Sequence, residues 1–204
     1  MKKEEKTEIT RNKIFQAAMK EFGSNGYAAG SVNNICKSGI NKGLIYHNFK
    51  DKEELYLACV KRSCEELIAC VLDEKADEDF VKYMSVRRKF FEEHEEEACI
   101  FLEARTHPPD QLQKKIEQIF MEMDELNTKI FQKELSRVRL REGVSEEEAL
   151  IYFEEIQKMY NLSFMKELKG NMSPREQLAL HEMNIHKIFD LMLYGIAKGG
   201  NEKC

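Results

Sequence analysis

The sequence contains little of what strand-rich or membrane-spanning proteins need. Its 204 residues include no Trp and only 3 Pro, and it has no alternating runs of β-branched residues that would predict strands. No apolar run approaches the roughly 20 residues that span a bilayer. The opening segment, MKKEEKTEITRNK, lacks the apolar core of a signal peptide. Lys, Glu, Leu, Ile, Met and Ala dominate instead, so we expect an all-α protein of the cytoplasm with no membrane partner.

Motifs for catalysis and metal binding are also absent. The chain has no nucleophile elbow, phosphate-binding loop or dinucleotide fingerprint. Its 6 Cys form no C-x-x-C pair, and a helix would not place His181 and His186 on a common face, because they are five positions apart. We therefore expect no enzyme activity, no cofactor and no metal site. The cysteines are interpreted as free thiols, and a thiol-based redox regulator stays open as an alternative.

The charge of the chain is unevenly distributed. The formal net charge is −5, but residues 1–50 hold 9 of the 32 basic residues and only 4 of the 37 acidic ones. This segment therefore carries +5, and the remainder carries −10. A nucleic-acid interface needs positive charge for the phosphates, so the first 50 residues are the part of the chain that fits such a role.

Residues 31–49, SVNNICKSGINKGLIYHNF, predict two short helices joined by a glycine turn. Ser31 and Asn41 are suited to cap them, and Gly39 is suited to the left-handed conformation of a tight turn. A preceding helix is expected from Arg11, after a cap at Thr10, to Gly23. The last two helices have the pattern of a helix-turn-helix, in which the second helix enters the major groove of DNA.

Residues 11–55 resemble the DNA-binding domain of the TetR family of bacterial transcription regulators. The resemblance rests on the pattern G-[VI]-x-K-G-x-[LI]-Y-x-x-F-x-x-K-E-x-L, which the chain matches from Gly39 to Leu55. It implies phosphate contacts for Tyr46 and His47. Leu44, where the family often has Thr or Ser, suggests an apolar contact such as one with a thymine methyl group. The predicted DNA-binding residues are Ser31, Asn41, Lys42, Gly43, Leu44, Tyr46, His47 and Lys52.

The rest of the chain predicts six further helices, which gives about nine in all. Long helices are expected over residues 52–72 and 110–141, a short one over 98–105, and capping boxes at Ser145 and Ser173 begin the last two. We expect two domains: residues 1–52 form the helix-turn-helix domain, and residues 53–204 form a helical domain that binds an effector and dimerises.

An effector pocket is implied by the resemblance, and the body supplies Met and aromatic side chains for an adaptable apolar cavity. Plain core packing is the alternative interpretation of the same side chains. The candidates are Phe80, Tyr83, Met84, Arg87, Phe101, Met123, Tyr152 and Met159.

The last helix is apolar nearly all round, which predicts burial against a second subunit. The candidate dimer residues are Tyr160, Phe164, Ile188, Phe189, Met192, Gly195 and Ile196. The sequence as a whole therefore predicts a homodimeric transcriptional regulator, a repressor on a palindromic operator of double-stranded DNA. A small, largely apolar effector would release it. A DNA-binding dimer without an effector is the main alternative.

Overall fold

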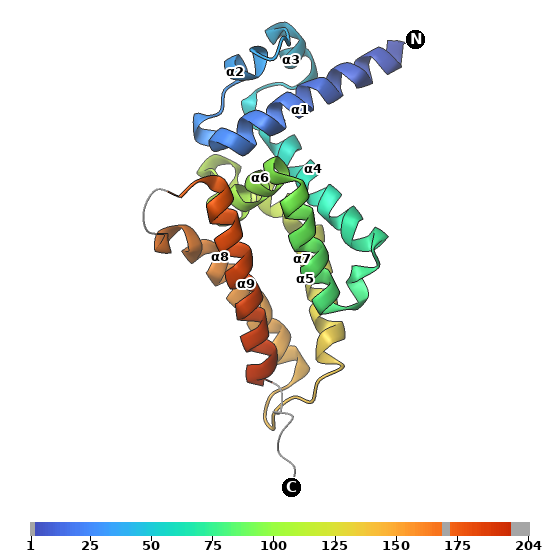
Figure 1. The fold of residues 1–204 in the computed structure, drawn as a ribbon, viewed down its shortest axis with the longest axis vertical. Coiled ribbons are helices and arrows are strands. Elements are labelled where there is room, and N and C mark those ends of the chain that lie inside the picture. Colours follow the sequence, from blue (N-terminus) through green and yellow to red (C-terminus); the bar gives the residue numbers. More distant parts are fainter. Residues whose placement is uncertain (1–2, 169–171, 197–204) are drawn as a thin grey trace. The chain divides into compact units, whose positions relative to one another are not determined.

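A computed structural model describes residues 3–168 and 172–196, and it shows an all-α fold (Figure 1). The helices follow one another as α1 (Lys3–Ala29), α2 (Val32–Cys36), α3 (Lys42–Asn48), α4 (Lys52–Asp73), α5 (Phe80–Glu93), α6 (Glu95–Thr106), α7 (Gln113–Leu135), α8 (Glu146–Glu167) and α9 (Pro174–Ile196). Two short 3₁₀ helices, η1 (Ala76–Glu78) and η2 (Asp110–Leu112), precede α5 and α7. No helix in the described ranges is both long and apolar enough to cross a membrane.

The chain packs as two compact units. Unit 1 comprises Met1–Glu66 and Glu93–Phe120, and unit 2 comprises Leu67–Glu92 and Met121–Cys204. Helix α6 therefore belongs to the same unit as α1, α2 and α3. The predicted boundary at residue 52 concerns function rather than packing, and it stays a prediction.

Helix α1 differs from its predicted bounds at both ends. It begins at Lys3, so Thr10 lies inside the helix, and it continues past Gly23 to a break at Gly26, where φ is 69° and ψ is 176°. The early start follows from KEEKTEI, which contains good helix formers. Gly23 does not end the helix. Its lack of a side chain lets α1 pack closely on α6 instead, since a Cβ there would lie 2.8 Å from the Glu96 Cα.

The helix-turn-helix forms as the sequence predicts. The Ser31 side chain accepts the Asn34 N–H (3.1 Å), and the Asn41 side chain accepts the Gly43 N–H (2.8 Å). Gly39 adopts φ 87° in the turn between the two helices. The apolar residues that hold the three helices together are fully or almost fully buried: Ile14, Phe22, Ile35, Ile45 and Phe49.

Helix α7 is shorter than predicted, because η2 replaces its first turn and the helix ends at Leu135 instead of Arg141. Near this end of α7, basic side chains bind the segment that follows α4. Lys133 Nζ lies 2.7 Å from Glu78 Oε1, and Arg137 Nη2 donates to the Glu78 carbonyl (2.6 Å). The apolar pattern of α7 does not predict these tertiary contacts, which involve residues more than 50 positions away.

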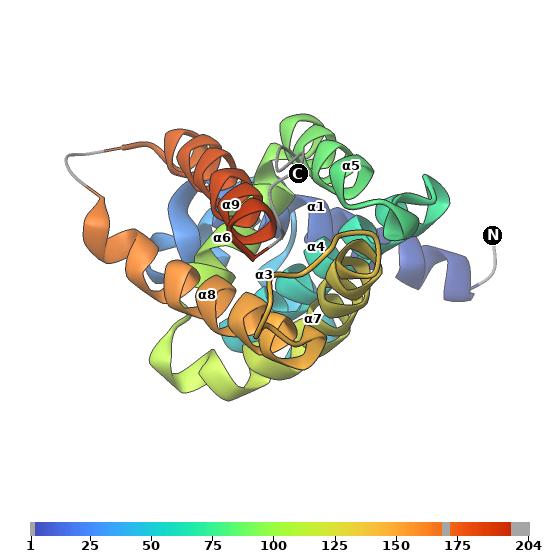
Figure 2. The ribbon, with the colours of Figure 1, turned by 90° about the horizontal axis from the view of Figure 1, so that it is seen from below.

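Helices α8 and α9 lie side by side in unit 2 (Figure 2). Both begin at the predicted capping boxes, with Ser145 and Glu148 in the first and Ser173 and Glu176 in the second. Stacked rings fill the space between elements of this unit: Phe131 lies 4.0 Å from Phe153, and Phe153 lies 5.1 Å from Phe189 between ring centres.

Candidate nucleic-acid interface

Helix α3 has one buried side and one solvent-facing side. Ile45 is 1% exposed, and Phe49, directly after the helix, is 2% exposed. Lys42, Gly43 and His47 are exposed, as are Leu44 at 40% and Tyr46 at 47%. The apolar anchors thus fix the rotation of the helix, and the outward face presents a cation, an imidazole, a phenol and an apolar side chain together.

Lys42 has a defined position on this face. Its Nζ lies 3.0 Å from the Asn33 Oδ1 on α2 and 6.0 Å from the centre of the Tyr46 ring. Sequence analysis missed Asn33, because the pair is nine positions apart across the turn and no helical spacing indicates it. The contact orients the ammonium group before any ligand is present, which lowers the entropy cost of binding.

Ser31 is held in place by α1. Its N–H donates to Glu21 Oε1 (3.0 Å), and the Asn34 side chain donates to the same oxygen (2.9 Å). Glu21 was also missed, since it lies on a different helix from both donors. The Ser31 hydroxyl oxygen is occupied by its cap, but its hydrogen remains available to a phosphate oxygen.

Lys52 stands at the start of α4 and is half-buried. Its Nζ lies 4.4 Å from the centre of the Tyr27 ring, within range of a cation–π interaction. Two further basic side chains of unit 1 pack on rings in the same way, Arg11 on Phe49 at 5.1 Å and Arg62 on Phe15 at 5.5 Å. Cation–π contacts therefore position these three basic side chains.

Residues 14–59 match the family model of bacterial regulatory proteins, tetR family. Residues 14–59 are thus a TetR-family DNA-binding segment. The HTH-type transcriptional regulator UidR of Escherichia coli (strain K12) is 37% identical over 76 residues, which cover 37% of this chain and 39% of that relative. The match therefore spans about two fifths of the curated relative. The family consists of regulators rather than enzymes, in agreement with the prediction that the chain is not an enzyme.

Solved structures resemble the fold of the whole chain. FadR of Bacillus subtilis in complex with stearoyl-CoA has a TM-score of 0.62 at 22% identity, covering 91% of this chain and 99% of its own. FadR of Bacillus halodurans has a TM-score of 0.63 at 16% identity, with the same coverage. At these identities the likeness concerns the fold.

The predicted pocket residues lie in different environments. In unit 2, Phe80, Tyr83, Met84, Arg87 and Met123 are buried. Tyr152 and Met159 lie on the surface of α8, at 56% and 61% exposure. Phe101 belongs to unit 1, where its ring centre lies 5.0 Å from that of Phe120. The set is therefore divided between the core of unit 2, the surface of α8 and unit 1, and the effector pocket stays a prediction.

The buried polar groups of unit 2 bind one another. Tyr83 Oη donates to Asn127 Oδ1 (2.6 Å), and Arg87 donates to both carboxylate oxygens of Glu182. His181, also buried, lies 3.0 Å through Nε2 from Asn161 Oδ1. Sequence analysis named Arg87 and Tyr83 but not Glu182, because Glu182 is 95 positions away from Arg87 along the chain.

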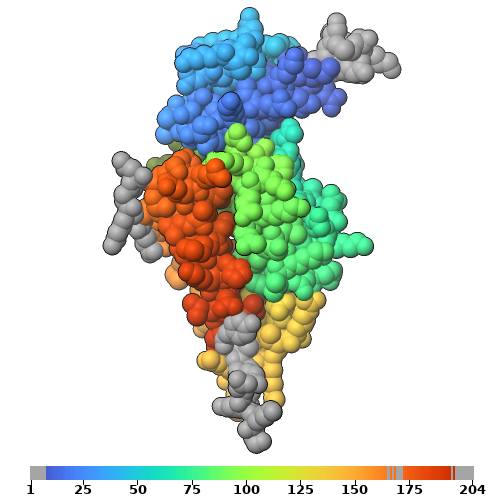
Figure 3. Space-filling model, viewed as in Figure 1, coloured from blue at the N-terminus to red at the C-terminus, as the bar shows by residue number. Residues whose placement is uncertain are grey.

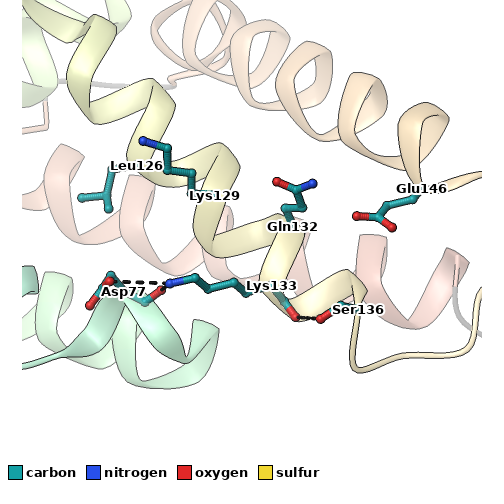
Figure 4. A pocket seen from close by; sticks show the side chains of 7 residues that line it. All are labelled: Asp77, Leu126, Lys129, Gln132, Lys133, Ser136 and Glu146. Atoms are coloured by element: carbon teal, nitrogen blue, oxygen red, sulfur yellow. Dashed lines mark hydrogen bonds and ion pairs between the residues drawn. The ribbon is translucent and has the colours of Figure 1, made fainter.

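A surface pocket of about 340 Å³ lies elsewhere in unit 2, at the end of α7 (Figure 4). All but one of its lining residues are polar or charged types, and none of the eight predicted pocket residues contributes to it. The lining residues are Asp77, Leu126, Lys129, Gln132, Lys133, Ser136 and Glu146. Lys133, which points to Asp77 in Figure 4, already pairs with it at 3.6 Å.

The predicted dimer residues are also divided. Phe164, Phe189 and Met192 are buried within the subunit, and Tyr160 and Ile188 are half-buried. Gly195 is exposed, and the Ile196 side chain lies outside the described part of the structure. The solvent-facing apolar side chains of α8 and α9 are instead Ile151, Tyr152, Met159, Leu162, Met183 and Leu191. Side chains of α9 form part of the molecular surface on the face shown in Figure 3.

No group of three or more His, Cys, Asp and Glu side chains suited to a metal ion occurs within residues 3–168 and 172–196. The cysteine environment also bears on the redox alternative. Burial raises the pKa of the Cys59 thiol, and it raises that of Cys99 to about 11. The thiolate is the reactive form, so both groups are poorly suited to redox sensing at neutral pH.

Proposed function

We propose that the chain is a homodimeric transcriptional repressor that reads operator DNA with α3 and is released by a small, largely apolar effector. The outward face of α3 is the observation that carries this proposal. It presents Lys42, Leu44, Tyr46 and His47 to solvent, and it lies in the positively charged first 50 residues of an acidic chain. Residues 1–52 would be the DNA-binding domain, and residues 53–204 the effector-binding and dimerisation domain.

Each residue of the face has a role that fits its chemistry. Lys42, oriented by Asn33, would bind a guanine edge or a phosphate, and Leu44 would contact a thymine methyl group. Tyr46 and His47 would donate to phosphate oxygens. Ser31, Asn41 and Gly43 would let the backbone approach the DNA at the two helix starts, and Lys52 would hold the DNA backbone from α4.

Dimerisation would place two such faces on one operator. A two-fold dimer reads half-sites about one DNA turn, roughly 34 Å, or a multiple of it apart. The apolar side chains exposed on α8 and α9 support this arrangement, because a second subunit would remove them from water. At Gly195 a Cβ would meet no heavy atom within 4 Å, so the position leaves room for a second helix.

The effector class follows from the body of the chain and from one similar structure. The FadR structure from Bacillus subtilis holds stearoyl-CoA, and the body here is rich in Met and aromatic side chains that adapt to apolar ligands. Long-chain acyl-CoA is therefore the first ligand class to test. Binding would shift the population of dimers away from the DNA-competent state.

A DNA-binding dimer without an effector is the second candidate. It is favoured by the dense packing of Phe80, Phe131, Phe153 and Phe189, whose rings lie in mutual contact. In the described residues, moreover, every buried side-chain nitrogen and oxygen has a hydrogen-bond partner, so none is held in reserve for a ligand.

The test is a mobility-shift assay on the DNA upstream of the gene. Wild type should bind it in a sequence-specific way, and Lys42→Ala should bind it more weakly. Stearoyl-CoA should release wild type from the DNA at concentrations that leave the protein folded. Specific binding that no acyl-CoA reverses would favour the second candidate. If wild type binds the upstream DNA no better than a scrambled duplex, the repressor proposal fails.

A further inference from the structure

A carboxylate on α6 binds two elements of the DNA-binding part of unit 1. Glu103 Oε1 and Oε2 accept the backbone N–H of Tyr27 at 2.8 and 3.0 Å, and Oε2 also accepts the Tyr56 hydroxyl at 2.8 Å. Tyr27 is near the end of α1, and Tyr56 is in the first turns of α4. One side chain of α6 therefore binds α1 and α4 at once. Hydrogen bonds to a carboxylate are about twice as strong as neutral ones.

The backbone of α1 is shaped to receive this carboxylate. The helix breaks at Gly26, with φ 69°, and the next N–H donates to Glu103. A Cβ at Gly26 would lie 2.7 Å from Glu103 Oε1, closer than contacts of real Cβ atoms. Glycine thus supplies two conditions together, the left-handed conformation and the space for the oxygen.

Aromatic rings enclose the Tyr56 end of the contact. The Tyr56 ring is fully buried, and its centre lies 5.3 Å from that of Phe22 and 4.8 Å from that of Tyr27. Burial raises the pKa of the Tyr56 hydroxyl, and the charge of Glu103 raises it further. The hydroxyl therefore stays protonated and acts as a donor to the carboxylate.

The segment that follows Tyr27 leads directly to the reading helices. The Gly30 N–H donates to the Gly26 carbonyl (3.0 Å), and the next residue, Ser31, caps α2. Four positions separate the N–H that Glu103 accepts from the start of α2. A displacement of Glu103 therefore reaches the helix-turn-helix through a short, hydrogen-bonded stretch of backbone.

We propose that Glu103 is the positioning residue through which α6 sets the placement of α2 and α3 for operator binding. This inference rests on the proposed function and assigns its regulation to one side chain. In the DNA-competent state the carboxylate holds Tyr27 and Tyr56. A change that moves α6 removes these acceptors, and α6 then no longer holds the intact helix-turn-helix in a fixed position. Glu103 touches no DNA and acts only through α1 and α4.

The experiment compares Glu103→Gln, Glu103→Ala and Tyr56→Phe with wild type. Glu65→Gln is the matched control, because it removes a carboxylate from the same unit that pairs at the surface with Lys61 (3.6 Å). Each full-length variant is titrated with a duplex carrying the whole upstream operator and with a duplex carrying one half-site. Amide hydrogen exchange of residues 22–35 is measured without DNA.

We expect Glu103→Ala to weaken binding to the whole operator by about 5-fold or more, the low end of typical coupling between sites. Binding to the half-site should change by less than about 2-fold, because the groove-facing residues are intact. Exchange at the Tyr27 amide should rise, and Tyr56→Phe should lie between Glu103→Ala and wild type. Glu65→Gln should match wild type in all three measurements.

Equal losses on the whole operator and the half-site would show that Glu103 only stabilises the fold of the head, and would overturn the inference. So would unchanged operator binding in both Glu103→Gln and Glu103→Ala. If Glu103→Ala does not fold, Tyr56→Phe and Glu103→Gln carry the same comparison. If wild type does not bind the operator, the proposed function is wrong. In that case the exchange measurement still tests whether Glu103 protects the Tyr27 amide.

Discussion

The Arg87 guanidinium and the Glu182 carboxylate form a two-pronged ion pair inside unit 2, with Nε–Oε2 at 2.8 Å and Nη2–Oε1 at 2.9 Å. Their side chains are only 9% and 10% exposed. The pair joins α5 to α9, and Arg87 Nη1 also lies 3.4 Å from the Tyr83 hydroxyl. Apolar rings also contact each other between these two helices, such as those of Phe80 and Phe189.

Removing one partner of this pair should destabilise the protein strongly. Arg87→Met or Glu182→Leu leaves an uncompensated buried charge, which costs about 3–5 kcal/mol. The double variant Arg87→Met/Glu182→Leu should recover most of that loss, because no charge remains buried. Urea unfolding at pH 7 measures all three. A double variant that is less stable than both single variants would show that the pair is needed for more than mutual charge compensation.

Stability should fall in acid through Glu182. Burial alone would raise the pKa of this carboxyl, but the Arg87 charge and hydrogen bonds from Arg87 and His181 outweigh it and lower the pKa to about 2 from an ordinary 4.5. A lowered pKa in the folded state contributes stability above pH 4.5 that is lost as the pH falls towards 2. The loss is on the order of 3 kcal/mol. Urea midpoints from pH 6 to pH 2.5 should show a smaller acid loss in Glu182→Gln than in wild type; parallel curves would contradict the assignment.

Gly23→Ala should disturb the contact between α1 and α6. The new Cβ would lie 2.8 Å from the Glu96 Cα, a backbone atom that side-chain rotation cannot move. Overpacking of this kind costs about 1–3 kcal/mol. Ser24→Ala, at the exposed neighbouring position of the same helix, is the control and should be neutral or slightly stabilising. Thermal unfolding compares them, and equal melting temperatures would argue against close packing of the two helices.

Lys42→Ala should weaken operator binding by about 10-fold or more, since a good contact to a base edge contributes about 1–3 kcal/mol. If Lys42 also neutralises a phosphate, the slope of log K against log salt should become shallower by about 1. Asn33→Ala should have a smaller effect, because it removes only the group that orients the ammonium. Lys61→Ala, an exposed lysine of α4, is the control for charge. Mobility shifts at several salt concentrations measure all four proteins.

The exposed apolar side chains of α8 and α9 should control the oligomeric state. Leu191→Glu and Met159→Glu place charges at positions that are 70% and 61% exposed in the single subunit. If these positions meet a partner, the charges would be buried on association and should shift the dimer towards monomer. Val81→Glu, at a 74% exposed position of α5, is the control. Light scattering after gel filtration reads the mass; dimers of unchanged stability in both α8 and α9 variants would place the interface elsewhere.

Local features were predictable because their physical causes lie within a few residues. Ser31 and Asn41 cap helices through neighbouring N–H groups, Gly39 takes its turn conformation from its lack of a side chain, and Ser145 and Glu148 form a box three positions apart. The exposure of the residues predicted to face DNA follows from the same logic, because Ile45 and Phe49 fix the orientation of α3.

The sequence by itself therefore determined the helices, the helix-turn-helix and its outward residues. Only the tertiary structure decided where α1 and α7 end. Gly23 lies in a close contact with Glu96 instead of ending α1, and Lys133 near the end of α7 binds the segment before α5. It alone paired Glu103 with Tyr27 and Tyr56, and Arg87 with Glu182, across 76, 47 and 95 positions. Helical periodicity relates residues three or four apart and carries no information on partners at such separations.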